Sequence, residues 1–298
     1  MSKIAEISIF LSFLGLWLTS FLKNETQVFV GFILILSFGI SHGANDLLII
    51  KKIRNENSTS YWKMLSIYIG TILIAILLFS FISWLVLLLF IIASGYHFGE
   101  QHWEKKIFTK QKIFHLLFQT NYGLLILLLL LHFHDEEVLK IIYGITDILI
   151  SKDLLTISFV TSCFLQIVFF CYASYQSRMF QRNLIKELFY LIMFVIIFKV
   201  GSLIWGFTVY FIFWHSIPSL CDQIKFLYGD ISFKNFKLFC QSALPYWIIS
   251  MFGVVISYIY LREYKIFDSI FFTFLAAITF PHVIVIERMY NKLNKKTE

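Results

Sequence analysis

The sequence predicts an all-α, polytopic integral membrane protein with about ten transmembrane helices. Hydrophobic residues make up 59% of the 298 residues, charged residues make up only 14%, and the mean hydropathy is +0.78. Water-soluble domains carry about 25% charged residues. The apolar stretches are long enough to cross roughly 30 Å of hydrocarbon as helices, and they do not alternate as barrel strands do. We therefore expect a single transmembrane helical domain over residues 1–298.

Apolar runs bounded by charged residues define the expected spans, in chain order. They are residues 5–22, 27–49, 63–80, 83–101, 114–133, 154–175, 186–201, 203–222, 242–261 and 267–287. One apolar run, 64–98, is too long for a single crossing and must divide near Ser80 and Ser83. Gly201 and Ser202 separate the seventh and eighth spans, since glycine and serine interrupt helices.

Two further segments complete this order. The first apolar run follows Lys3 and lacks a small-residue cleavage site, so we expect a retained helix and not a signal peptide. Residues 135–152 mix acidic and basic side chains with apolar positions. This composition favours an amphipathic segment at the membrane interface over an additional span.

The distribution of lysine and arginine predicts the orientation of the chain. With ten spans, 19 of the 25 basic residues fall on the side that holds both termini, and 6 fall on the other. Basic residues concentrate in cytoplasmic loops, so we expect both termini in the cytoplasm. The expected location is the inner cell membrane, which the chain crosses several times. Topology and anionic lipid then account for the net charge of +7, and no nucleic-acid partner is expected.

Four histidines lie inside the expected spans at similar depth. His42, His97, His215 and His282 are on the second, fourth, eighth and tenth spans, which all run toward the cytoplasm. Each lies roughly 9–15 Å below the first basic residue of its loop at 1.5 Å per residue. Any one of them is explained by a hydrogen bond to a neighbouring carbonyl. Together they predict a metal or proton site, because intramembrane polar groups are costly and imidazole is a common metal ligand.

Carboxylates follow two of these histidines closely. Asp46 is four residues after His42, a spacing that puts both on one face of a continuous helix, and Glu100 is three residues after His97. A metal-bound histidine usually donates its other N–H to a carboxylate or carbonyl, so Asp46 and Glu100 are the candidate catalytic carboxylates. For Glu100, an interfacial charge near the loop is an equal alternative. His102 lies about 140° around the helix from His97 and is expected at the interface.

Two of the three prolines lie close to the same histidines. Pro218 is three residues after His215, and Pro281 directly precedes His282. Proline removes an amide donor and displaces the carbonyl four residues earlier. We therefore expect each proline to kink its helix and to open space beside the imidazole.

Four short motifs in this order resemble a known family. They are "HGANDLL", "YHFGEQHW", "FWHS" and "TFPH", spread over about residues 42–287. The set resembles the Brp/Blh family of bacterial and archaeal β-carotene 15,15'-dioxygenases. The resemblance implies an integral-membrane, non-haem Fe(2+) enzyme that uses O2 to split β-carotene at its central double bond into two all-trans-retinal molecules, often for a rhodopsin.

The resemblance implies that His42, His97 and His215 are iron ligands. The family typically has a second histidine four residues after the late one, and here that position is Ser219, a poor iron ligand. We expect His282 to replace it as fourth ligand, while three ligands would also leave positions open for oxygen. Candidate substrate-lining residues are Tyr96, Phe98, Phe211, Trp214 and Phe280, with Ser219 among them; for the aromatic residues, ordinary helix packing is the alternative.

Other functions remain open at this point. A di-iron lipid or carotenoid hydroxylase or desaturase needs clustered histidine boxes, and eight histidines without an HxxHH motif are too few for two metals. A membrane carotenoid- or lipid-binding protein fits the composition. A transporter or proton relay fits the histidines and predicts a water-accessible path to the opposite face.

Overall fold

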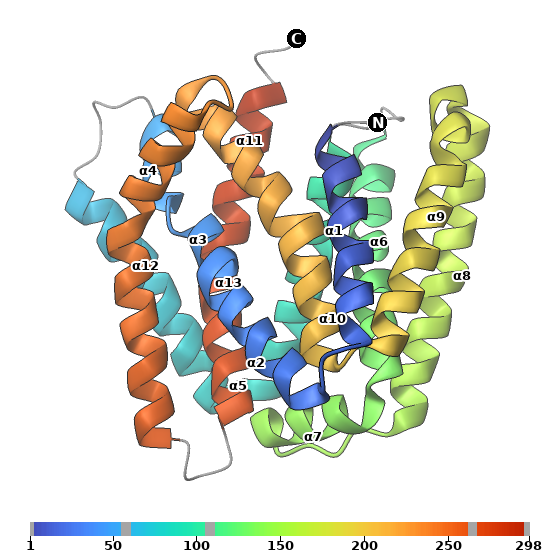
Figure 1. Cartoon of the computed structure of the whole chain (residues 1–298), viewed down its shortest axis with the longest axis horizontal. Coiled ribbons are helices and arrows are strands. Elements are labelled where there is room, and N and C mark those ends of the chain that lie inside the picture. Colours follow the sequence, from blue (N-terminus) through green and yellow to red (C-terminus); the bar gives the residue numbers. More distant parts are fainter. Residues whose placement is uncertain (1–2, 55–60, 105–110, 262–266, 295–298) are drawn as a thin grey trace. The chain divides into compact units, whose positions relative to one another are not determined.

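A computed structural model of the protein describes residues 3–54, 61–104, 111–261 and 267–294 (Figure 1). Every regular element in these ranges is a helix, which confirms the all-α class. Five helical stretches of the described chain are long and apolar enough to cross a membrane. They are Asn24–Ile53, Trp62–Trp103, Lys112–Phe133, Lys152–Gln176 and Leu203–Tyr228. The protein is therefore a helical membrane protein, and ten crossings with cytoplasmic termini stay a prediction.

Two breaks that the sequence predicts are present in the backbone. Helix α5 (Tyr61–Trp103) contains a non-helical residue at Ile82, with φ −139° and ψ 54°, between Ser80 and Ser83. Helix α9 (Arg178–Val200) ends just before Gly201, and the Ser202 side chain then accepts a hydrogen bond from the amide of Trp205. Both predicted breaks are confirmed. Serine side chains can form hydrogen bonds with the backbone that compete with those of the helix.

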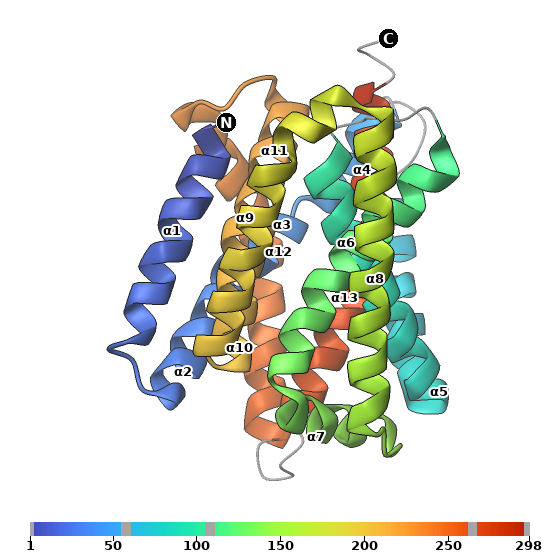
Figure 2. The ribbon, with the colours of Figure 1, turned by 90° about the vertical axis from the view of Figure 1, so that its right-hand side faces the viewer.

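The helices belong to two compact units, which we describe separately. Unit 1 comprises residues 1–33, 91–143 and 149–215. Its helices are α1 (Lys3–Thr19), most of α2 (Asn24–Leu34), the second part of α5, α6 (Lys112–Phe133), most of α7 (Asp135–Thr146), α8 (Lys152–Gln176), α9, α10 (Leu203–Tyr210) and most of the π-helix η3 (Phe211–Ser216). Helix α8 packs along α6 and against α9 (Figure 2).

Aromatic side chains fill the core of unit 1 at one end of α6. Trp103 and Phe118 have ring centroids 4.8 Å apart in an edge-on arrangement, and Trp103 also meets Tyr122 at 5.3 Å. Phe170 of α8 and Phe180 of α9 close the cluster, 5.5 Å from each other. Edge-on aromatic pairs add to the energy of area burial. Many of the abundant phenylalanines thus serve packing.

Unit 2 comprises residues 34–90, 144–148 and 216–298. Its elements are the π-helix η1 (Ile35–Gly39), α3 (Ile40–Gly43), α4 (Asp46–Ile53), the first part of α5, α11 (Ile217–Tyr228), α12 (Phe233–Leu261) and α13 (Phe267–Asn294). Helix α13 packs on α4 and α12, and α11 packs on α3, α4 and α12. A buried cluster of Ile49, Ile286 and Met289 lies where α13 crosses α4. The grouping of the whole chain into one functional domain stays a prediction.

The segment that the sequence assigns to the interface forms the amphipathic helix α7, followed by a turn. Its first residue, Asp135, pairs with Lys152 at 2.7 Å on the surface. The hydrogen bond from Lys152 lowers the pKa of the Asp135 carboxyl below its usual value. An exposed pair of this kind contributes little to stability, but it connects the ends of α7 and α8.

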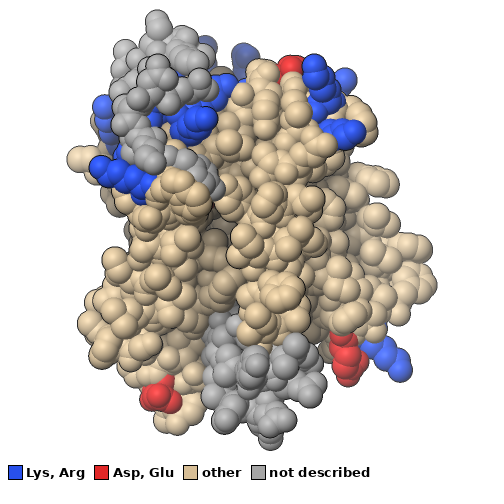
Figure 3. Space-filling view, turned by 90° about the vertical axis from the view of Figure 1, so that its left-hand side faces the viewer, with Lys and Arg blue, Asp and Glu red and all other residues tan. Residues whose placement is uncertain are grey.

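Charged side chains are unevenly distributed over the surface. On the face shown in Figure 3, most lysine and arginine side chains lie toward the top of the view, with an acidic side chain among them; acidic and basic side chains both appear at the bottom, below a broad uncharged zone. Large apolar residues are exposed on many helices, for example Trp17 at 59% and Phe81 at 76%. Such exposure is unfavourable in water and favourable in lipid, as expected for a membrane protein.

The predicted orientation is tested with a reporter enzyme that is active only outside the cytoplasm. Fused after Glu298, it should be inactive, because the basic loops hold that side in the cytoplasm. Fused after Lys23, between the first two spans, it should be fully active and serve as the control. Strong activity at Glu298 would contradict the ten-span topology.

Candidate metal centre

Both π-helical segments of the described chain lie beside a candidate histidine. In unit 2, η1 ends three residues before His42, which is on the short helix α3. In unit 1, η3 contains His215. Pro218 follows in the first turn of α11, where a missing amide hydrogen is tolerated. The backbone irregularity thus lies at and before the histidine, and π-helical turns of this kind are frequent at functional sites.

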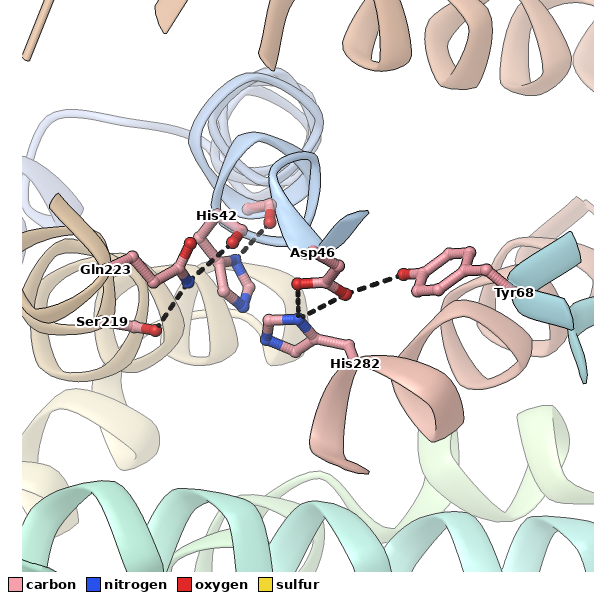
Figure 4. Close-up of polar contacts among 7 residues, drawn as sticks. His42, Asp46, Tyr68, Ser219, Gln223 and His282 are labelled. Carbon is pink, nitrogen blue, oxygen red and sulfur yellow. Dashed lines mark hydrogen bonds and ion pairs between the residues drawn. The ribbon is translucent and has the colours of Figure 1, made fainter. Parts of the chain in front are cut away.

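Unit 2 brings His42 and His282 together. Their ring centroids are 4.7 Å apart with an interplanar angle of 85° (Figure 4). The Nδ1 atom of His42 is hydrogen-bonded to the carbonyl of Gly39, the last residue of η1. If Nδ1 donates, Nε2 carries the lone pair that a metal requires. Both side chains are buried, at 5% and 4% exposure.

Asp46 is the hydrogen-bond partner of His282. Its Oδ1 and Oδ2 atoms lie 2.9 and 3.0 Å from His282 Nδ1, and Tyr68 Oη donates to Oδ2 at 2.8 Å. The expectation that Asp46 shares a helix face with His42 is wrong, because α3 ends at Gly43 and Asp46 begins the separate helix α4. The carboxylate contacts the imidazole of His282 instead.

A side-chain amide fixes the backbone at His42. Gln223 Nε2 donates to the carbonyl of His42 at 2.7 Å and lies 3.1 Å from Ser219 Oγ (Figure 4). Both α11 side chains are buried, at 0% for Gln223 and 1% for Ser219. Ser219 therefore accepts a hydrogen bond from the glutamine that holds α3.

Unit 1 brings His97 and His215 together in a similar way. Their ring centroids are 4.6 Å apart at an angle of 76°, and both side chains are only 1% exposed. Phe98 meets the His215 ring at 4.6 Å, and Phe211 stacks on it at 5.5 Å and 20°. Gln101 Nε2 donates to the His215 carbonyl at 2.8 Å, which ties α5 to η3.

Glycines on either side of His97 bring α5 into backbone contact with α6. A Cβ atom built on Gly99 would lie 1.8 Å from the carbonyl oxygen of Gln119, and one built on Gly123 would lie 1.9 Å from that of Gly95. Gly95 and Gly99 are four residues apart, the spacing that lets membrane helices approach closely. The glycines of the "GYHFGEQHW" motif therefore have a packing role that places His97.

Of the remaining predicted site residues, some form hydrogen bonds and others pack against apolar side chains. Glu100 is buried and accepts a hydrogen bond from Tyr96 at 2.8 Å, within one turn of α5. Trp214 Nε1 donates to Ser12 Oγ at 2.8 Å, so this side chain fastens η3 to α1. Phe280 packs beside the buried cluster of unit 2 that contains Phe79. Of the proposed aromatic residues, Phe98 and Phe211 have ring contacts with the candidate histidine His215.

Sequence reasoning missed several polar residues of these two groups. Tyr68 and Gln223 hold Asp46 and His42 from other helices, and no local pattern marks either residue. Glu187, 2% exposed on α9, lies 2.6 Å from His102 Nε2, so His102 has a carboxylate partner within unit 1. Glu187 stands next to Lys186 at the start of an expected span, where the sequence indicates only an interfacial charge.

The donor chemistry of the two histidine pairs suits a transition metal. Neutral imidazoles are good ligands for iron, copper and zinc, whereas magnesium and calcium prefer oxygen. Gly39 and Asp46 each engage one ring nitrogen of a histidine, the arrangement typical of metal-bound imidazoles. The residues present therefore fit the ferrous ion that the sequence motifs imply.

The fold and the site thus define the class of protein. It is a helical membrane protein with two units, and each unit buries a pair of histidines. A family model described as Beta-carotene 15,15'-dioxygenase matches residues 33–290. The chain belongs to this family, which confirms the resemblance drawn from the motifs and supports a carotene dioxygenase type of enzyme. No curated protein and no solved structure matches the chain.

Substitution of the contact glycine tests how tightly His97 is placed. Gly99→Ala should lower the free energy of unfolding by about 1–3 kcal/mol or more, because the added methyl group overlaps a backbone carbonyl that cannot move independently of α6. Gly70→Ala is the control on the same helix, since nothing lies within 4 Å of its added Cβ. Thermal unfolding in detergent measures both. Equal melting temperatures for the two variants would contradict the close approach of α5 and α6.

Proposed function

We propose that this protein is a carotenoid cleavage dioxygenase of the inner cell membrane that converts β-carotene and O2 into two all-trans-retinal molecules. The family match over residues 33–290 carries this proposal. The reaction breaks one carbon–carbon double bond and forms two carbonyl groups, and each product takes one atom of O2. Oxidant and substrate balance without an external reductant, so no nicotinamide or flavin partner is required.

The proposed cofactor is a ferrous ion held by His42, His97, His215 and His282. Bound to these residues, a ferrous ion would supply the redox chemistry that activates O2. The chain contributes ligand geometry: the Gly39 carbonyl orients His42. Asp46 accepts a hydrogen bond from His282 Nδ1 and so orients this imidazole.

The proposed substrate is an apolar polyene that reaches the histidines from the bilayer. Phe98 and Phe211 pack on the His215 ring and present apolar faces beside it. An apolar surrounding excludes water from reactive oxygen species, and aromatic faces stabilise developing positive charge along a polyene. Retinal released into the membrane would be available to a rhodopsin.

Expression in a carotene-producing bacterium tests this proposal directly. We expect cells that express the protein to lose β-carotene and accumulate all-trans-retinal, measured by extraction and chromatography. His97→Ala should abolish retinal because a candidate ligand is lost. Its matched control is His132→Ala, since His132 stacks on Phe159 in unit 1 and belongs to neither histidine pair. Absence of retinal with a correctly folded, iron-loaded protein would refute the proposed reaction.

The same assay distinguishes the two candidates for the fourth ligand. His282→Ala should lose iron and retinal formation as severely as His42→Ala, whereas Ser219→Ala should be mild, because a hydroxyl is a weak iron ligand. If His282→Ala keeps both iron and turnover while Ser219→Ala abolishes them, the assignment of His282 is incorrect.

The orienting role of Asp46 gives a further prediction. Asp46→Asn should weaken iron binding by about 10–100-fold, the usual effect of losing a carboxylate behind a metal-bound histidine. Tyr68→Phe should have a smaller effect in the same direction, because Asp46 keeps its contact with His282. Competition with a ferrous chelator on purified protein measures both.

Asp222→Asn provides the matched control for Asp46→Asn. Asp222 is also a buried carboxylate of unit 2, at 6% exposure, and it accepts a hydrogen bond from the Tyr290 hydroxyl at 3.1 Å. Its replacement should reduce stability and leave the iron affinity unchanged. Equal loss of affinity in both variants would show that Asp46 acts only through folding.

A further inference from the structure

We propose that unit 2 binds an anionic phospholipid in a cleft bordered by α4, α5 and α13, with the phosphate on Arg54 and Arg288. The cleft has a volume of about 220 Å³. Among the described residues that line it, two are arginines, none is acidic, and the others are apolar or carry a hydroxyl group. Its lining therefore offers positive charge and apolar surface to one molecule.

The two arginines lie at one end of the cleft. Arg54 follows the last turn of α4, Arg288 is on α13, and both are exposed. Lys292 of α13 adds a third positive charge near these arginines, because its Nζ donates to the Ile53 carbonyl at the end of α4 at 2.7 Å. Guanidinium groups bind phosphate oxygens in pairs of hydrogen bonds. The sequence places these residues on the cytoplasmic side, where anionic lipid is available.

The other end of the cleft is apolar and deeper along the helices. Pro281 precedes Arg288 by seven residues, about 10 Å at 1.5 Å per residue. Ile67 and Ile284, 55% and 46% exposed, form walls that an acyl chain would cover. A free phosphate ion would leave these walls uncovered. Because the cleft is smaller than the ~300–1,000 Å³ of sites that enclose a whole ligand, it suits part of a lipid whose remainder lies on the helix surface.

Two residues that line the cleft are also close to His282 or to its partner Asp46. Tyr68 lines it and donates its hydroxyl hydrogen to Asp46, and Pro281 lines it next to His282. A bound lipid would therefore pack against the residues that orient this imidazole. The inference concerns a binding site beyond the proposed reaction and does not depend on that reaction, because its test measures bound lipid.

Native mass spectrometry of the purified full-length protein, titrated with phosphatidylglycerol or phosphatidylcholine, tests the site. The wild type should bind phosphatidylglycerol more tightly than phosphatidylcholine, and the double variant Arg54→Gln/Arg288→Gln should bind phosphatidylglycerol about tenfold more weakly or worse, since two basic contacts are lost. Thr71→Trp, which fills the deep end and keeps both arginines, should weaken binding as well. Arg54→Lys/Arg288→Lys should retain part of the affinity and shows that the positions tolerate substitution.

The matched control is Arg178→Gln/Arg182→Gln, which removes two exposed arginines of α9 on the same predicted side of the membrane and should leave binding unchanged. Equal affinity of the wild type for both lipids would overturn the proposal, as would an unaffected Arg54/Arg288 variant. An unaffected Thr71→Trp variant would place the lipid outside the cleft. Displacement of phosphatidylglycerol by millimolar inorganic phosphate would identify a free-anion site instead.

Discussion

The arrangement of unit 2 depends on the hydrogen bond between Asp46 and His282, which gives a buried carboxylate a partner. A carboxylate buried among apolar helices is costly unless its oxygens have partners. Asp46 is 1% exposed, and its oxygens contact His282 Nδ1 and the Tyr68 hydroxyl. Because these residues come from α4, α13 and α5, satisfying one carboxylate aligns three helices. The direction of the His282 ring and the wall of the neighbouring cleft both depend on this alignment.

In unit 1, backbone features position His97 and His215. Gly95 and Gly99 let α5 approach the α6 backbone, and this contact fixes the helix that carries His97. The π-helix η3 widens the turn that carries His215, whose carbonyl accepts from Gln101. A π-helical turn changes the direction in which the following side chains point, and small residues reduce the distance between two helices. A regular helix with larger side chains would therefore place His97 and His215 differently. Sequence motifs around the histidines thus encode backbone geometry as much as chemistry.

Hydropathy and chain breaks predicted the helices well, because burial in lipid requires long apolar runs and only a few residues interrupt them. The division near Ser80 and Ser83 and the break at Gly201 both follow from that rule. The partner of Asp46 was not predictable from helical spacing, since a turn separates α3 from α4; Gly43 and Asn45 are turn-forming residues and were the available signal. Tyr68 and Glu187 were missed because their partners lie far away in sequence, where local periodicity carries no information.

Ser219 illustrates how a departure from a family pattern can keep a structural role. Its hydroxyl accepts from Gln223 Nε2, and the same nitrogen donates to the carbonyl of His42. An amide group has two hydrogens on nitrogen, so Gln223 can serve both acceptors at once. Without the Ser219 hydroxyl, one of these hydrogens would lose its acceptor in a fully buried place, while the hydrogen bond to the His42 carbonyl would remain. The serine therefore satisfies a buried hydrogen of the glutamine that contacts His42, which leaves the proposed metal chemistry to the imidazoles.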